Sequence, residues 1–196
     1  MTELSQKANE IIACTRQLLT TGGYKSFSYA DIADVVQIRK ASIHHHFPGK
    51  ADLVRTVVVQ YCEEARAGMM ALDQKLNNPL EELKAYINYW SQCIEDGSST
   101  FCICAMLAVE LPTLPAEVAT EVSGHFNDLS AWLASLLQKG QQEGVFKLQE
   151  SPAVEAQSLM ATVHGAMLSA RAFNNASLFQ QIVQPVLNRI MAENLR

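Results

Sequence analysis

The chain has 196 residues, of which 48% are hydrophobic and 18% charged, and its formal net charge is −5. This length predicts one or two domains with a substantial buried core, and the composition excludes a disordered or collagen-like chain. No apolar run approaches the ~20 residues that a membrane-spanning helix needs. The first residues also lack the layout of a secretion signal, so we expect a cytoplasmic protein with no membrane partner.

Almost every segment repeats its apolar residues with a helical period, and glycine or proline ends most segments. The predicted helices, in chain order, are 5–22, 28–36, 39–47, 50–76, 80–96, 100–110, 116–142, 152–174 and 176–194. Ser28, with Asp31 three residues later, predicts a capping box at the start of the second helix. No strand-like alternation of useful length is present in the sequence. The predicted fold is therefore all-α, with about nine helices.

The first three helices have the proportions of a helix-turn-helix unit, in which 5–22 braces the two short helices that follow. With Ile43 and Phe47 facing inward, the outward face of the third helix is small or polar and carries no acid. A helix that enters the DNA major groove needs such a face, because phosphates repel carboxylates. Residues 1–60 carry seven basic and five acidic residues, a net charge of +2, whereas residues 61–196 carry −7. A basic head favours an anionic partner.

The stretch from Asp31 to Leu53 resembles the signature of TetR-type transcriptional regulators. The matching residues are Ile32-Ala33, Ser42-Ile43-His44-His45-His46-Phe47, Lys50 and Leu53. The resemblance implies a homodimeric repressor that binds double-stranded operator DNA and is released by a small apolar inducer. It further implies a helix-turn-helix DNA-binding domain at 1–49, a ligand-binding and dimerisation domain at 50–196, association with the nucleoid on DNA, and no enzymatic activity.

The resemblance also assigns roles within the DNA-binding domain, residue by residue. Ser28 and Tyr29 would touch the phosphate backbone at the start of the positioning helix. Arg39, Lys40 and Ser42 would reach base edges from the start of the recognition helix. His44, His45 and Lys50 would contact phosphates, with Lys50 at the beginning of the fourth helix.

The turn before the recognition helix departs from the family pattern, because Gln37 stands where glycine is usual. A left-handed backbone is harder for glutamine than for glycine, so we expect a strained or differently shaped turn. His44 and His46 occupy tyrosine-like positions, where an imidazole still donates to phosphate but carries a pH-dependent charge. Neighbouring histidines on a helix point about 100° apart and are not expected to share a metal ion.

The last two helices, within 152–194, are predicted to pair two subunits. One apolar stripe repeats at spacings of three and four, and the final helix carries a second stripe. Small residues on such stripes permit close helix approach, as in a four-helix bundle between subunits. Packing inside a single subunit is the alternative for the same pattern. The residues are Ala153, Ala156, Met160, Val163, Met167 and Ala170, then Leu178, Ile182, Val186 and Ile190, with small Ala161, Gly165 and Ala166.

The middle helices collect aromatic, methionine and cysteine side chains, which line many apolar ligand pockets and also fill ordinary cores. Glu110, His125 and His164 are polar residues in apolar surroundings and are candidates for orienting a ligand. The predicted pocket consists of Tyr86, Trp90, Cys93, Phe101, Cys102, Met106, Phe126 and His164.

The five cysteines are an odd number without a secretion signal, which favours reduced thiols over disulfides. Their spacing along the chain does not match a zinc motif, so no metal and no cofactor are expected. The segment from Phe101 to Pro115, with Cys102 near its start and Leu111-Pro112 near its end, resembles the same segment of family members whose cysteine senses electrophiles. Where those members have a lysine four residues later, this chain has Met106. A thiol-based sensor at Cys102 is therefore kept as an alternative to a neutral apolar inducer.

Two further alternatives belong to other classes of function. An enzyme with a cysteine or histidine nucleophile would need a base and an orienting group, and the sequence shows no such constellation. An architectural DNA-binding protein without a ligand would be expected to have a basic body, whereas this body is acidic.

Overall fold

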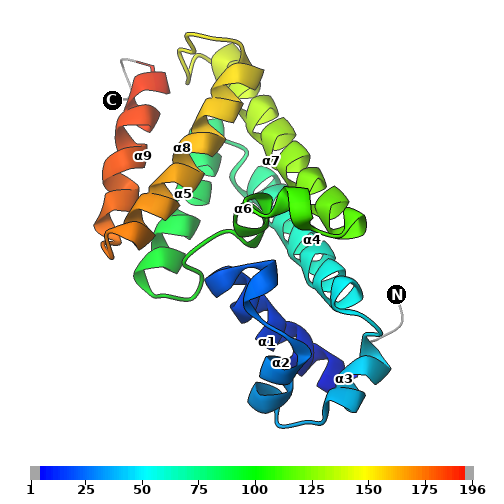
Figure 1. The fold of residues 1–196 in the computed structure, drawn as a ribbon. Helices are drawn as coiled ribbons and strands as arrows, with labels where there is room; N and C mark the ends of the chain where they lie inside the picture. Colours follow the sequence, from blue (N-terminus) through cyan, green and yellow to red (C-terminus); the bar gives the residue numbers. More distant parts are fainter. Residues whose placement is uncertain (1–4, 193–196) are drawn as a thin grey trace. The chain divides into compact units, whose positions relative to one another are not determined.

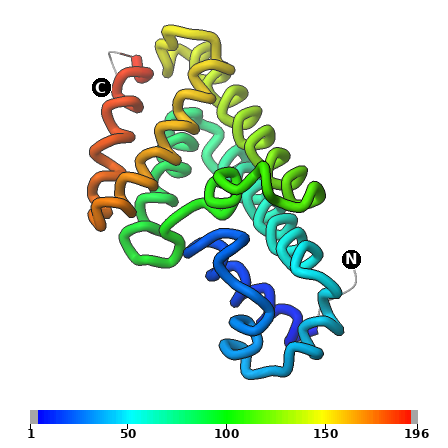
Figure 2. Tube along the Cα trace, in the orientation of Figure 1, coloured from blue at the N-terminus to red at the C-terminus, as the bar shows by residue number. Residues whose placement is uncertain are grey.

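The computed structural model describes residues 5–192, and within them the fold is all-α, as predicted (Figure 1). The tube in Figure 2 follows the same path from blue to red. The extended pairing in this part of the chain is a single bridge between Phe146 and Met191. The α-helices are α1 (Gln6–Gly22), α2 (Tyr29–Val36), α3 (Lys40–His46), α4 (Lys50–Leu76), α5 (Pro79–Glu95), α6 (Ile103–Ala108), α7 (Ala116–Gln142), α8 (Pro152–Ala172) and α9 (Ser177–Ile190), with 3-10 helices η1 (Tyr24–Ser26) and η2 (Leu111–Thr113).

The largest difference from the predicted helices is at 100–110, where α6 is only six residues long. Pro112 accounts for its end. Proline has no amide hydrogen, and its ring clashes with the carbonyl four residues earlier, which here belongs to Ala108. The chain continues as the 3-10 helix η2, and α7 begins directly after Pro115.

Side-chain caps fix the starts of four helices. The capping box predicted at Ser28 is confirmed: its hydroxyl accepts from the Ala30 amide, and Asp31 accepts from the Ser28 amide at 2.7 Å. Such caps satisfy amides that have no partner inside a helix and contribute about 1 kcal/mol each. Ser5, Asn78 and Ser151 cap α1, α5 and α8 in the same way.

The chain forms two compact units, which differ from the domain boundary predicted at 49/50. Unit 1 runs through Glu64 and includes Cys102–His125, and unit 2 comprises Ala65–Phe101 and the chain from Phe126 onward. Unit 1 therefore joins the helix-turn-helix to the first part of α4, to α6 and to the start of α7. Its core includes Ile11, Leu19, Ile32, Ile43, Leu53, Ile103 and Leu107, all essentially inaccessible to solvent.

In unit 2, α8 and α9 form an antiparallel pair (Figures 1 and 2). Glu155 of α8 is buried and accepts two hydrogen bonds from the Arg189 guanidinium of α9, at 3.2 and 2.8 Å. The hydrogen bonds from Arg189 favour the charged form of Glu155 and lower its pKa, and this effect is larger than the opposing effect of burial. This pair ties the start of α8 to the end of α9.

The pairing stripe assigned to α8 from the sequence is largely wrong. Ala156, Val163, Met167 and Ala170 lie inside unit 2, where they pack in its core. Helical spacing alone cannot tell which of two apolar faces meets the same subunit. The exposed face of α8 carries Val154, Ser158 and Leu168, together with Ala161 and Gly165 from the predicted small residues. On α9, Ile190 is also buried, whereas Leu178, Ile182 and Val186 are half-buried.

Across residues 5–192, every helix is too short or too polar to cross a membrane.

Candidate functional site

The turn between α2 and α3 has the left-handed backbone that glycine would supply. Gln37 closes α2 with φ 56° and ψ 50°, and its amide donates to the Ala33 carbonyl. Its side-chain amide donates to the Asp34 carbonyl at 2.6 Å. The turn thus keeps the shape that positions α3, at the conformational cost expected for a residue other than glycine.

Replacing Gln37 tests this reading of the turn. Gln37→Gly should leave the free energy of unfolding unchanged or raise it by up to ~1 kcal/mol, since relief of strain offsets the added freedom of the unfolded chain. Gln37→Val should lower it by about 1–3 kcal/mol, because a β-branched residue resists the left-handed region. Urea unfolding of both variants measures the difference, and equal stabilities would contradict the assignment.

The outward face of α3 is exposed, as the recognition-helix assignment requires. Arg39, Lys40, His44 and His45 are exposed, and Ser42 is half-buried. On the opposite side, Ile43 is completely buried and Phe47 is 4% exposed, so both belong to the core. Residues 37–47 contain no carboxylate. The face therefore carries positive charge and hydrogen-bond donors, and it has no carboxylate that a phosphate would repel.

Tyr29 and His44 fix the end of α3 against the start of α2. The Tyr29 hydroxyl donates to the Phe47 carbonyl at 2.9 Å, and its ring meets the His44 ring edge-on at 4.8 Å. Burial, reinforced by the charge of Asp52, raises the pKa of Tyr29 to about 12 and keeps the hydroxyl a donor. His44 Nδ1 lies 3.1 Å from the Pro48 carbonyl, which can only accept, so Nε2 is the nitrogen left for an outside partner.

Lys50 was predicted to contact a DNA phosphate, but in the structure its ammonium binds groups of the protein itself. Its ammonium donates to the carbonyls of Tyr24 and Phe27 and lies over both of their rings, 3.9 Å from the Phe27 centroid. Burial lowers the pKa of Lys50, and the nearby Glu110 carboxylate opposes that effect. The half-buried ammonium is therefore occupied inside unit 1, where it holds the loop between α1 and α2.

Glu110, just after α6, binds backbone amides of the same loop. One carboxylate oxygen accepts from the Tyr24 amide at 2.5 Å, and the other accepts from the Lys25 amide at 3.3 Å. The approach is close: a β-carbon on Gly23, which has φ +82°, would lie 2.7 Å from the Glu110 carboxylate. Glu110 thus links α6 to the helix-turn-helix within unit 1, and its carboxylate is not directed at a ligand.

Lys50→Ala is expected to act on stability and to leave the electrostatics of DNA binding unchanged. Loss of charged hydrogen bonds to two carbonyls should lower the free energy of unfolding by about 1–3 kcal/mol. The dependence of DNA affinity on salt should keep its slope, since no phosphate contact is removed. Urea unfolding and fluorescence-anisotropy titrations at several salt concentrations measure the two quantities. If the salt dependence of DNA affinity instead decreases by about one phosphate contact, and the stability is unchanged, Lys50 contacts a phosphate as first predicted.

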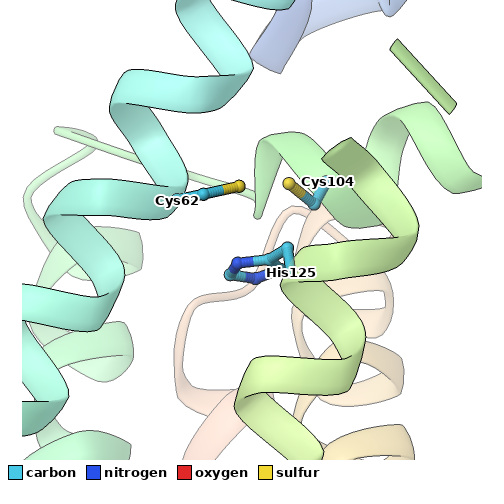
Figure 3. Close-up of side chains that lie close together, drawn as sticks. All are labelled: Cys62, Cys104 and His125. Atoms are coloured by element: carbon cyan, nitrogen blue, oxygen red, sulfur yellow. The ribbon is translucent and has the colours of Figure 1, made fainter. Parts of the chain in front are cut away.

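A second polar cluster of unit 1 lies in its core, where three helices meet (Figure 3). Cys62 comes from α4, Cys102 and Cys104 from the start of α6, and His125 from α7. All four are buried, and Cys102 and Cys104 are fully inaccessible. Cys102 Sγ lies 3.8 Å from His125 Nε2 and accepts a hydrogen bond from the Tyr61 hydroxyl at 3.2 Å. The cluster brings together thiols that the sequence spreads over 43 positions.

The thiols and the imidazole of this cluster change one another's protonation. Burial alone would lower the pKa of His125, but hydrogen bonds and charge interactions with Cys102 and Cys62 raise it to about 9. Hydrogen bonding to Cys102 and Cys62, together with burial, raises the pKa of Cys104. These contacts thus favour the charged form of His125 and the protonated form of Cys104.

The predicted pocket residues are divided between the two units. Cys102 and Met106 belong to unit 1, and the other six belong to unit 2. Within unit 2, Phe126 and His164 meet edge-on at 5.4 Å, and Tyr86 meets Trp132 at 5.5 Å. Tyr86, Trp90 and Phe101 are buried, whereas Cys93 is half-buried. The Trp132 indole N–H is buried and has no hydrogen-bond acceptor among residues 5–192.

Comparison with known proteins decides the family. Residues 79–186, more than half of the chain, match the family described as "Tetracyclin repressor-like, C-terminal domain", and residues 11–57 match "Bacterial regulatory proteins, tetR family". The chain belongs to the TetR family. A TetR-family transcriptional regulator from Agrobacterium tumefaciens is 52% identical, with a TM-score of 0.93 over 95% of this chain and 98% of its own.

Two more distant TetR-type relatives agree with this assignment. The HTH-type transcriptional repressor DhaR of Mycobacterium sp. (strain GP1) is 23% identical over 176 residues, which cover 89% of this chain and 87% of DhaR. The reduced form of E. coli NemR shares the fold, with a TM-score of 0.81 and 18% identity over 95% of this chain and 98% of its own. The protein is accordingly a DNA-binding transcriptional regulator of the TetR family, with its helix-turn-helix in α2 and α3.

The sequence contains only part of the signal for the buried cluster of Cys62, Cys104 and His125 in this TetR-family chain. Val118, Val122, His125 and Leu129 recur at spacings of four, three and four, which puts His125 on the buried face of its helix. The partners of His125 lie on other helices, and only the fold brings them to it.

Proposed function

We propose that the exposed face of α3 reads operator DNA, with Arg39, Lys40 and Ser42 at base edges and His44 and His45 at phosphates. The observation that carries this proposal is the acid-free, exposed face opposite the buried Ile43 and Phe47. Ser28 and Tyr29, at the start of α2, are also proposed phosphate contacts, and the Tyr29 ring lies against His44 of α3. The protein would act on the nucleoid, in the cytoplasm.

Selection of DNA fragments from the source genome by the purified protein tests this function. We expect enriched fragments to share a two-fold symmetric sequence whose half-sites are spaced by a multiple of roughly 34 Å. Fragments with no common sequence would argue for a binding protein without sequence preference.

The homodimer is proposed to form through the exposed face of α8 and the half-buried stripe of α9. Val154, Ala161, Gly165 and Leu168 recur along one side of α8, where Leu168 is 58% exposed. An apolar stripe of this kind on a surface helix favours burial against a second copy. Gly165 has open space beside its α-carbon, so the stripe leaves room for a facing helix to approach closely.

Release from DNA is proposed to follow binding of a small apolar inducer in unit 2. The aromatic pairs of Tyr86 with Trp132 and of Phe126 with His164 supply the apolar walls. The Trp132 indole N–H, buried and without an acceptor, supports a hydrogen bond to a ligand. An inducer that prefers the released state would shift the equilibrium by a coupling free energy of ~1–3 kcal/mol.

Trp132→Phe tests the proposed ligand contact, because it removes the N–H donor and keeps an aromatic ring. With the fluorophore 1-anilinonaphthalene-8-sulfonate as probe, we expect weaker binding by about 1 kcal/mol and unchanged operator affinity. Tyr89→Phe removes a hydroxyl from an exposed ring of unit 2 and is the matched control. Equal effects of both substitutions would contradict a specific role for the indole of Trp132.

The second candidate mechanism is thiol sensing at Cys102, favoured by the contacts of its sulfur with Tyr61 and His125. Glu110 lies just beyond the same helix and binds the loop before α2, which gives a route from the thiols to the DNA-binding helices within unit 1. N-ethylmaleimide should then release operator from the wild type but not from Cys102→Ser. Release that persists in Cys102→Ser would exclude this mechanism and leave the neutral inducer.

A further inference from the structure

The buried cluster of unit 1 has the geometry of a coordination site. One ligand atom from each of Cys62, Cys104 and His125 lies within 4.8 Å of the other two. Ligand atoms on one tetrahedral zinc lie roughly 3.5–3.8 Å apart, given Zn–S bonds of about 2.3 Å and Zn–N bonds of about 2.0 Å. Small side-chain rotations therefore suffice to bring the three atoms onto one ion.

A fourth sulfur, that of Cys102, lies beside the imidazole of this group. Cys102 Sγ is 3.8 Å from His125 Nε2. The Tyr61 hydroxyl donates to Cys102 Sγ and orients it. Hydrogen bonds of this kind, outside the ligand set, fix the direction of metal ligands.

The chemistry of the donors selects the kind of ion. Thiolates and imidazole suit zinc and monovalent copper, whereas calcium and magnesium require oxygen ligands. Two thiolates balance the charge of Zn²⁺, whereas a third thiolate on Zn²⁺, or two thiolates on Cu⁺, leave a net charge of −1. Burial of the whole group then carries little net charge, which a site in the core requires.

We propose that Cys62, Cys104 and His125, with Cys102 beside them, form a binding site for a thiophilic d10 cation, Zn²⁺ or Cu⁺. The ion would bind α4, α6 and α7 together at one point in unit 1. On binding, the thiols and the charged His125 imidazole would release their protons to solvent. The site rests on side chains distinct from the DNA-binding face and does not depend on the proposed inducer or operator.

Metal competition on the full-length reduced protein tests the proposal. Zn²⁺ is titrated against a chromophoric zinc chelator, and Cu⁺ against bathocuproine disulfonate under anaerobic conditions. Co²⁺ serves as a spectroscopic probe of the zinc site. We expect one equivalent of at least one of the two ions, and for Co²⁺ the visible bands of a tetrahedral site with sulfur-to-metal charge transfer.

Single substitutions then assign the ligands. Cys62→Ser, Cys104→Ser and His125→Asn should each lose the tightly bound equivalent. Cys14→Ser, Cys93→Ser and His164→Asn are matched controls that should retain it. Cys102→Ser separates the ions: zinc affinity should fall, because zinc prefers four ligands, whereas Cu⁺ held by three ligands should remain.

X-ray absorption of the metal-loaded wild type keeps the test independent of whether the variants fold. A first shell of two or three sulfurs and one nitrogen is expected. The proposal is overturned if the wild type competes for neither ion, or if the bound ion has an oxygen-rich shell. Retention of the equivalent in folded Cys62→Ser, Cys104→Ser and His125→Asn would overturn it as well. Operator binding is a separate measurement, so failure here leaves the DNA-binding function untouched.

Discussion

Gly165→Glu should convert the proposed homodimer into a monomer and weaken operator binding by at least about 100-fold. The proposed interface would then bury an unpaired charge on each subunit at the closest approach of the helices. A monomer engages only one half-site and loses the gain of roughly 10²–10⁴ that linking two DNA-binding heads provides. Analytical ultracentrifugation measures the association state, and anisotropy titration with operator measures the affinity.

Gly165→Glu should not disturb the fold of its own subunit. A β-carbon at Gly165 meets nothing within 4 Å in its own subunit, and glutamate is a better helix former than glycine. The monomer should therefore fold at least as stably as the wild type. Met70→Glu changes an exposed side chain, 61% accessible, on α4 and should leave the proposed dimer intact. A dimeric Gly165→Glu would place the subunit interface elsewhere.

Arg39→Ala and Lys40→Ala should relax the preference for particular base pairs by roughly 1–3 kcal/mol, a factor of about 5–150 in affinity ratio. Both side chains are exposed at the start of α3, where the helix would enter the major groove. Affinities for the selected operator, and for copies with one changed base pair, measure the effect.

Lys75→Ala removes an exposed lysine near the end of α4 and is the matched control. It should lower neither the affinity nor the discrimination. If Arg39→Ala and Lys40→Ala instead weaken binding equally on selected and random DNA, these residues contact only the backbone phosphates.

The sequence predicted the helices well because their signals are local. Ser28 with Asp31, Asn78 before Pro79 and Ser151 before Pro152 each mark a helix start through contacts two or three residues away. The buried Ile43 and Phe47 likewise follow from spacing on one short helix. The residues of α3 between and around these two buried positions form its exposed face, so that face follows from the same spacing.

Properties that depend on contacts between distant segments were not predictable. Lys50 was expected at phosphate, but its ammonium lies on carbonyls 23 and 26 residues earlier in the chain. The stripe on α8 repeats correctly, yet which side faces the core depends on α9 and α5. The Cys62, Cys104 and His125 cluster exists only because α4, α6 and α7 meet in unit 1. No spacing along the chain encodes that meeting.

The central claim is that this TetR-family protein reads a specific DNA sequence through α3. Its most direct test is the ratio of dissociation constants for the selected operator and for a scrambled duplex of equal length, both at the same physiological salt concentration. We expect a ratio of at least about 10³, as specific DNA-binding proteins show, and a marked reduction of this ratio in Lys40→Ala. A ratio near one, unaffected by Lys40→Ala, would contradict this claim.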